Sequence, residues 1–191
     1  MKTKLLRRFA AIACFALATS MGSADILAPG MVANDAIGQI NSLETSDGFS
    51  AQFWMTTDEQ IFSTWAKSGA IRALKPTIQV KRNTPIFLAL FMANPGVRTV
   101  VKSATKPVLI SDVTFDLYII NPNGSLSLAN KARVGWSGTP PPPQLVHLAK
   151  DRGMLNFEVI DPTGQYTIVV MLHDNVRKTD MKLVRKLELV E

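Results

Sequence analysis

Hydrophobic and polar residues alternate in short stretches along most of this chain. The alternation is clearest in residues 113–120, which place four hydrophobic side chains on one face: Val113, Phe115, Leu117 and Ile119. A period of two is typical of a β-strand with one buried face. The same pattern, or a continuous hydrophobic run in one case, predicts eight strands: residues 49–55, 77–81, 85–92, 113–120, 125–134, 154–160, 166–173 and 181–190.

One stretch has a helical spacing, and it is short. Ile61 and Trp65 lie four residues apart within residues 58–67, which predicts one or two helical turns. Strands with short connections and no long helix bury their hydrophobic faces most simply as two stacked sheets. We therefore predict an all-β protein, with an antiparallel β-sandwich in residues 49–191. Residues 25–48 show no sustained period and are expected to form an irregular N-terminal arm.

Two turn motifs separate predicted strands. Asn-Pro-Asn-Gly at residues 121–124 suits a hairpin, because proline fixes one turn position and glycine can adopt a positive φ. Asp-Pro-Thr-Gly-Gln-Tyr forms a second tight turn directly before a strand. That turn resembles the tyrosine corner of immunoglobulin-like sandwiches, in which the tyrosine hydroxyl bonds to the preceding loop. The resemblance implies a structural corner made by Asp161, Gly164 and Tyr166, with Ile168 where antibody domains have a cysteine.

A longer resemblance covers residues 113–191. Its motifs are the strand Thr114-Phe-Asp-Leu-Tyr118, the two turns, Val134-Gly-Trp-Ser-Gly138 and His173-Asp-Asn-Val176. Together they are similar to bacterial secreted or periplasmic proteins with an immunoglobulin-like β-sandwich domain, which are largely uncharacterised. The resemblance implies an immunoglobulin-like sandwich and brings no catalytic or binding residues with it.

The N-terminus has the three regions of a secretory signal peptide. A basic region with four Lys and Arg residues precedes an uncharged hydrophobic core, and small residues follow. We predict a signal peptide in residues 1–24, cleavage before Asp25, and a periplasmic or secreted protein. The hydrophobic core is too short to cross a bilayer, so we expect no permanent membrane anchor.

Cleavage would change the charge and remove the single cysteine, Cys14. The chain of 191 residues has 21 Lys and Arg against 15 Asp and Glu, and four of the basic residues lie in residues 1–24. The remaining 167 residues then have 17 basic and 15 acidic residues, a net charge of +2, which does not favour nucleic acid as a partner. Without Cys14 the mature chain can form neither a disulfide nor a thiolate metal site.

Candidate catalytic or metal-binding residues are few. His147 and His173 are the two histidines, and neither has sequence-near ligands at the usual spacing. Ser137 lies in Gly-Trp-Ser-Gly, one residue short of a nucleophile elbow, so we expect a bend there. Asp58 and Glu59 are adjacent in sequence and are expected to lie on the surface. We therefore expect no catalytic residue, no metal and no cofactor, and predict that the protein is not an enzyme.

Two surfaces are candidates for binding. The first is formed by the tryptophans Trp54, Trp65 and Trp136, although we expect the short helix to cover Trp54. The second is the basic stretch at residues 97–107, which contains Arg98, Lys102 and Lys106. We expect this stretch to be a solvated loop, and a contact with an acidic polymer at the cell envelope is the alternative.

These observations predict a non-catalytic binding or structural module, with an unknown protein or glycan of the cell envelope as its partner. A carbohydrate-binding module that uses exposed tryptophan is one alternative. An envelope enzyme or a metal-binding protein, with a site not visible in the sequence, is the other.

Overall fold

A computed structural model describes residues 44–68, 76–101, 106–143 and 145–191. Its elements, in chain order, are β1 (Glu44–Ser46), β2 (Phe49–Thr56), α2 (Ile61–Ser68), β3 (Gln79–Lys81), β4 (Ile86–Ala93), β5 (Arg98–Val101), β6 (Pro107–Ile120), β7 (Leu126–Gly138), β8 (His147–Leu148), β9 (Gly153–Leu155), β10 (Gly164–Asp174) and β11 (Thr179–Val190). The protein is therefore all-β, as predicted. The predicted signal peptide lies outside the described residues. Within the described parts, no helix has the length and hydrophobicity needed to span a membrane.

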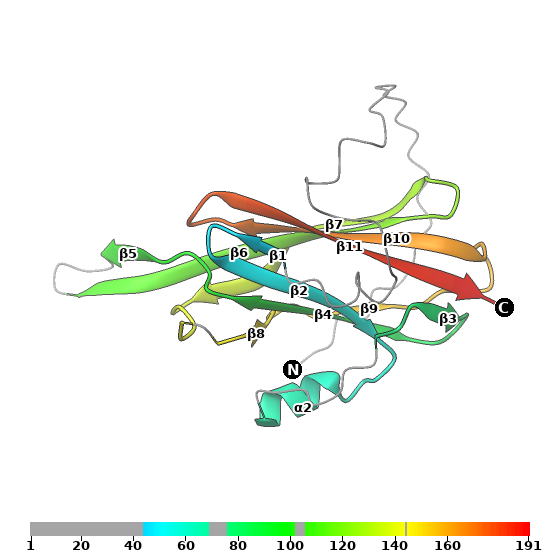
Figure 1. The fold of residues 1–191 in the computed structure, drawn as a ribbon, viewed down its shortest axis with the longest axis horizontal. Helices are drawn as coiled ribbons and strands as arrows, with labels where there is room; N and C mark the ends of the chain where they lie inside the picture. The colour runs from blue at the N-terminus through cyan, green and yellow to red at the C-terminus, as the bar shows by residue number, and fades with distance from the viewer. Residues whose placement is uncertain (1–43, 69–75, 102–105, 144) are drawn as a thin grey trace, which may run out of the picture.

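The strands form two sheets, which lie as two layers in Figure 1. The first sheet has the order β1-β2-β4-β8, and β9 also pairs with β4. The second has the order β3-β11-β10-β6-β5, and β7 pairs with β6. Among the described residues, the neighbouring strands pair antiparallel except β3 with β11. β1 lies at the end of the segment predicted to be irregular.

The main hydrophobic core lies between the sheets. The alternating residues of β6 face it as predicted, and all four are buried: Val113, Phe115, Leu117 and Ile119. β4 reads as a continuous hydrophobic run because both of its faces are covered. Leu88 and Leu90 belong to the main core, whereas Ala89 and Phe91 pack with α2 on the outer side of the first sheet. The short helix therefore closes the face of β4 that the second sheet does not cover.

The hairpin turn between β6 and β7 forms as predicted. Gly124 donates its N–H to the carbonyl of Asn121 at 2.9 Å, and Asn121 donates its N–H to the carbonyl of Ser125 at 2.8 Å. Gly124 has a φ of +84°, a conformation that glycine adopts without steric cost. The turn sets where β7 begins to return along β6, and the register then shifts at three places along the described pair.

The strand predicted at residues 154–160 is wrong for most of its length, because it ends at β9. Asp161 explains the early end: one carboxylate oxygen accepts the N–H of Glu158 at 2.6 Å, and its own N–H donates to the carbonyl of Glu158 at 3.1 Å. These bonds close a turn in place of a strand. Val159 and Ile160 are consequently exposed.

The solvated loop predicted at residues 97–107 is also wrong. Its first part forms β5, which pairs with residues 107–110 of β6, from Arg98 opposite Ile110 to Val101 opposite Pro107. The prediction failed because the basic residues obscured two short hydrophobic runs that pair with each other. The resulting hairpin projects beyond the sandwich in Figure 1. We call β5 together with residues 106–110 the basic hairpin.

Candidate functional site

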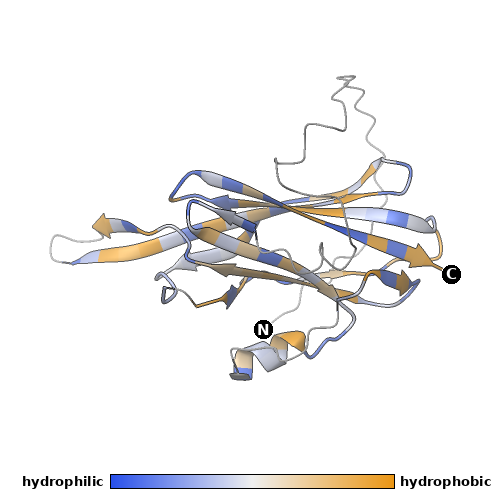
Figure 2. Ribbon diagram, in the orientation of Figure 1, coloured by the Kyte–Doolittle hydropathy of each residue, from blue (hydrophilic) through white to orange (hydrophobic). Residues whose placement is uncertain are grey.

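The basic hairpin continues the core-facing side of β6 past the sandwich. Ser111 and the alternate residues after it are buried, whereas Leu109, on the same face, is 54% exposed. Cross-strand partners share a face, so Thr99, opposite Leu109, and Val101, opposite Pro107, belong to it as well. Val101 is 70% exposed. Figure 2 shows that the hydrophobic character of β6 continues into this projecting part. The face is thus built like a core surface but lies in solvent.

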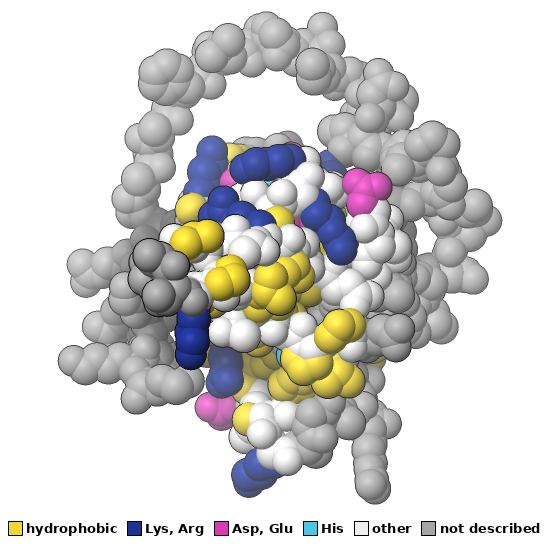
Figure 3. Space-filling model, turned by 90° about the vertical axis from the view of Figure 1, so that its left-hand side faces the viewer, with side chains coloured by type: hydrophobic (Ala, Val, Ile, Leu, Met, Phe, Trp, Pro, Cys, Tyr) yellow, Lys and Arg dark blue, Asp and Glu magenta, His cyan; other side chains and the backbone are white. Residues whose placement is uncertain are grey.

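All the charged residues in the segment that contains the basic hairpin are basic. Residues 94–110 contain Arg98, Lys102 and Lys106 and no Asp or Glu. Arg98 and Lys106 are exposed. Figure 3 views the molecule from the hairpin end, where hydrophobic side chains gather with Lys and Arg side chains around them. A hydrophobic patch beside basic groups is therefore the dominant surface feature of this end.

The base of the basic hairpin is held by the buried carboxylate of Asp174, the last residue of β10. Its Oδ2 accepts the N–H of Gly96 at 2.6 Å, and its Oδ1 accepts the N–H groups of Val176 and Arg177, both at 3.0 Å. The hydroxyl of Ser111 donates to the carbonyl of Gly96 at 2.7 Å. A Cβ at Gly96 would lie 2.8 Å from Asp174 Oδ1, so this close approach requires glycine. The hairpin therefore leaves the body from a fixed base.

Two of the candidate tryptophans lie where α2 packs on the first sheet, Trp54 on β2 and Trp65 on α2 itself. Trp54 and Trp65 pack against a hydrophobic cluster that includes Ile61 and Phe91. The ring centroids of Trp65 and Phe91 are 4.9 Å apart in an edge-on arrangement. Both side chains are half-buried in this contact, and Trp54 packs against the cluster that α2 contributes to.

The third tryptophan, Trp136, is half-buried near the end of β7. Its indole N–H donates to the carbonyl of Thr139 at 2.9 Å. The His147 ring lies edge-on with its centroid at 5.2 Å, and Lys150 Nζ lies 5.2 Å from the centroid of the indole. The segment around Trp136, predicted as a bend, is extended and belongs to β7. The chain itself therefore occupies the surroundings of this ring.

The two histidines lie in different sheets, His147 on β8 and His173 on β10. His173 Nδ1 is 2.7 Å from a carboxylate oxygen of Asp180, and its Nε2 is 3.9 Å from Asp116. In the part of the chain that the structure describes, no three His, Cys, Asp or Glu side chains are grouped to hold a metal ion. The structure does not bring the two histidines together as one site.

Asp116 organises the outer face of the second sheet. Its Oδ1 accepts the N–H of Ala132 at 2.8 Å, and its Oδ2 accepts the hydroxyl of Tyr118 at 3.0 Å. Ala132 has a φ of +54° where β7 shifts register against β6. Burial raises the pKa of Asp116, but the two hydrogen bonds and the charges of His173 and Lys131 outweigh it and lower the pKa. These contacts give Asp116 a structural role in holding the irregular register.

The predicted corner is present in its hydrogen bonding. The hydroxyl of Tyr166 donates to the carbonyl of Pro162 at 2.8 Å, and the side chain is buried. Gly164 starts β10 with a φ of +126°, and Asp161 closes the turn before it. Burial raises the pKa of Tyr166 to about 12; the carboxylate of Asp161 adds to this, and Arg82 opposes it. The corner ties the connection after β9 to the edge of the sandwich.

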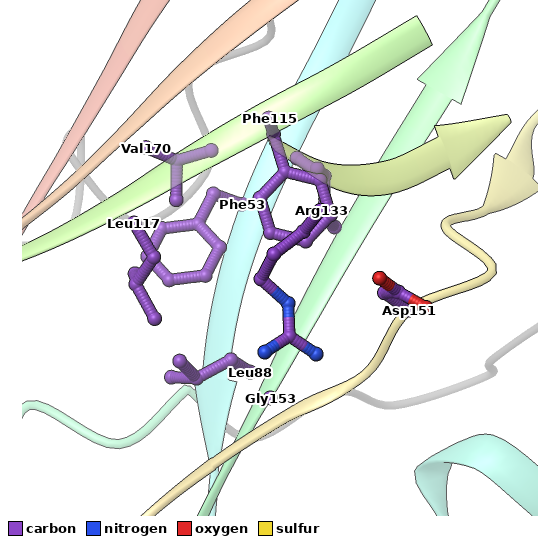
Figure 4. Close-up of a pocket in the computed structure, with 9 residues that line it drawn as sticks. Phe53, Leu88, Phe115, Leu117, Arg133, Asp151, Gly153 and Val170 are labelled. Carbon is purple, nitrogen blue, oxygen red and sulfur yellow. The ribbon is translucent and has the colours of Figure 1, made fainter. Parts of the chain in front are cut away.

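A small pocket lies between the sheets, and its walls are mostly hydrophobic core residues (Figure 4). Arg133 and Asp151 supply the charged groups among the residues that line it. Arg133 donates to the carbonyl of Arg152 at 2.8 Å, and Asp151 accepts the N–H of Val134 at 2.9 Å. Both side chains thus bind backbone groups, while Arg133 Nε is buried without a hydrogen-bond partner among the described residues.

No protein-family model and no curated protein matches this chain. A family 123 glycoside hydrolase from Clostridium perfringens is similar in structure, with 8% sequence identity, a TM-score of 0.43 and a match over 74% of this chain and 27% of that one. An alkylpurine DNA glycosylase from Pseudomonas fluorescens has 13% identity and a TM-score of 0.36, over 60% of this chain and 28% of that one. A Niemann-Pick type C2 protein from Japanese carpenter ant has 8% identity and a TM-score of 0.38, over 74% and 91%.

These likenesses assign neither a family nor a function to the chain. The chain also spans less than a third of the length of the first two proteins. The features that bear on function are therefore those of the molecule's own surface.

The sequence marked the charge of the basic hairpin but not its hydrophobic face or its anchored base. The available signal was a pair of hydrophobic runs close in sequence: Val100, opposite Val108, and Val101, opposite Pro107, precede the run at residues 108–110 by a few residues. Asp174 gave no signal of its own, because its partners lie far away in the sequence, at Gly96, as well as in the turn that follows it.

Proposed function

We propose that this protein is a non-catalytic binding module of the periplasm or the extracellular space, and that the basic hairpin contacts its partner. The observation that carries the proposal is the exposure of Val101 and Leu109 on a projecting element that also bears Arg98 and Lys106. Contiguous exposed hydrophobic surface with a polar rim is typical of interaction sites. The anchored base lets the hairpin present this surface without reordering the sandwich.

An immunoglobulin-like sandwich is the proposed scaffold. The hydrogen bond between Tyr166 and Pro162 and the two stacked, mainly antiparallel sheets support it. The signal-like pattern of residues 1–24 supports export. The mature chain would then have no cysteine, which suits a scaffold that depends on its core for stability.

The geometry gives the two alternatives less support. A carbohydrate platform needs an open aromatic face, whereas Trp54 and Trp65 are half-buried between α2 and the first sheet and Trp136 is contacted by Lys150. A catalytic or metal site that used His173 would have to break its hydrogen bond with Asp180, its partner across the β10–β11 pair.

A site-specific photo-crosslinker tests the proposal. Placed at Leu109 in the exported protein, it is expected to form adducts with envelope material. The matched control is Ile160, which is 81% exposed in a different turn and is expected to form few adducts. Equal adduct formation from both positions, or none from Leu109, would contradict a binding role for the basic hairpin.

A further inference from the structure

The basic hairpin combines two chemistries that one partner must satisfy together. Val101 and Leu109 lie on one face and gain stability by leaving water. Arg98 and Lys106 are exposed cations, and residues 94–110 contain no acidic residue to neutralise them. A matching partner therefore offers an apolar medium and negative charge at the same place.

The surface of an anionic lipid layer offers both. Its acyl boundary accepts apolar side chains, and its phosphates attract Lys and Arg. An acidic polysaccharide supplies charge but no medium that buries Val101 and Leu109. A second copy of this chain would bring a hairpin of the same positive sign, so the charges favour the lipid surface.

The shape of the basic hairpin suits a flat surface. Among the described residues, 107–110 pair with β5 alone, so this part is a two-stranded ribbon. The pair Val101–Pro107 and the pair Thr99–Leu109 are two residues apart, which is about 7 Å along a strand. Arg98, opposite Ile110, lies on the other face of the ribbon. Long Lys and Arg side chains can extend around the ribbon edges to reach headgroups while the apolar face points into the lipid.

The anchored base keeps this face in place. Asp174 and Ser111 hold Gly96, which lies two residues before the start of the basic hairpin. A surface that is ordered before binding loses less conformational entropy when it binds.

We propose that the basic hairpin is a membrane-docking element, whose apolar face enters the interface of an anionic lipid layer while Arg98 and Lys106 bind headgroup phosphates. This inference rests on the proposed function, because it names the class of partner for the same element.

Vesicle flotation of the exported protein tests the proposal. We expect binding to vesicles that mix phosphatidylglycerol with phosphatidylcholine, and much weaker binding to phosphatidylcholine alone. The double variant Arg98→Gln, Lys106→Gln should lower the partition coefficient about 25-fold, since each basic residue near such a surface contributes roughly fivefold. The double variant Val101→Ser, Leu109→Ser should lower it by roughly tenfold or more through lost burial.

Matched controls change the same chemistry elsewhere. Lys182→Gln with Lys186→Gln removes two charges from β11, and Val159→Ser with Ile160→Ser removes exposed hydrophobic surface from the turn before the corner. Both should bind like the unchanged protein. All substituted positions in the hairpin are exposed, and an unchanged thermal midpoint shows that each variant is folded.

Four outcomes would overturn the proposal. They are no binding to anionic vesicles, equal binding to both vesicle types, equal losses in the hairpin and control variants, and binding to soluble polyglutamate that survives Val101→Ser, Leu109→Ser. Adducts from Leu109 to an envelope protein without vesicle binding would refute lipid docking and leave the binding role of the hairpin intact. Absence of both adducts and vesicle binding would refute the two proposals together.

Discussion

The two halves of β6 share one core-facing side and have opposite surroundings. In residues 111–120 every second side chain is buried between the sheets, from Ser111 to Ile119. In residues 107–110 the same face continues, but Leu109 is open to solvent. Residues 108–110 are a continuous hydrophobic run, whereas residues 113–120 alternate, so the sequence itself does not mark Leu109 as exposed. The surroundings differ because the first sheet covers one half and does not reach the other.

This comparison distinguishes two properties: which side chains share a face of a strand, and whether that face is covered. Alternation determines which side chains share a face, because that follows from the pleat of a single strand. Whether that face is buried depends on the other sheet, whose strands are remote in sequence. A hydrophobic face without cover is therefore a candidate for contact with something outside the fold.

The largest expected effect tests the two halves directly. Phe115→Ala should lower the free energy of unfolding by about 3–5 kcal/mol, because it removes a buried ring and leaves a cavity. Leu109→Ala, on the same face of the same strand, should change it by less than about 0.5 kcal/mol. Urea unfolding of both variants measures the contrast. Similar losses would mean that Leu109 is covered in solution.

Much of the fold was predictable because the strands of the body carry their own signals. The faces of β2 and β6, the turn at Gly124 and the bond of Tyr166 to the preceding loop all follow from local pattern. The shortened β9 and the paired β5 were not, because Asp161 closes a turn that overrides a hydrophobic run and charge obscured a hairpin.

The candidate site was predictable in its charge alone. Arg98 and Lys106 are visible in the sequence, whereas the exposure of Leu109 depends on where the first sheet ends. Similarly, the packing of Trp54 against the cluster that α2 contributes to could be expected from the short helical spacing, but the contacts of Trp136 with Lys150 and Thr139 could not.

The second effect concerns the point where the two halves meet. Asp174→Ala should cost about 2–3 kcal/mol, because a buried carboxylate that accepts three backbone N–H groups is lost and those donors lose their partner. Asp174→Asn keeps one carbonyl oxygen and should cost less. Hydrogen exchange of the Gly96 amide should rise in Asp174→Ala. An unchanged exchange rate would show that Asp174 does not hold the base of the basic hairpin.

A smaller effect is expected at the corner, which belongs to the body alone. Tyr166→Phe should cost about 1 kcal/mol near neutral pH, because the carbonyl of Pro162 loses its donor. Membrane partition should not change, since the corner makes no contact with the basic hairpin in this proposal. A variant that unfolds at the midpoint of the unchanged protein would contradict a stabilising corner.

The same tyrosine gives an alkaline signature. Its folded pKa of about 12 exceeds the ordinary value of 10, so the folded chain holds the proton more tightly than the unfolded chain. This contribution is fully present below pH 10 and is lost as pH rises through about 12. The stability advantage over Tyr166→Phe should therefore shrink in that window, as measured by urea unfolding at each pH.

The smallest expected effect lies on the other side of the buried half of β6, at Asp116. Its pKa is lowered in the folded state, so its contribution is present above the ordinary value of 3.8 and is lost as pH falls through the lower folded value. Asp116→Asn retains an oxygen that can accept the N–H of Ala132, and should cost less than about 1 kcal/mol at neutral pH. The difference from the unchanged protein should disappear in acid. Glu188→Gln, which removes a carboxylate from β11, is the control for charge alone. If the Asp116→Asn difference persists at low pH, the carboxylate charge does not stabilise the shifted register between β6 and β7, and packing alone holds it.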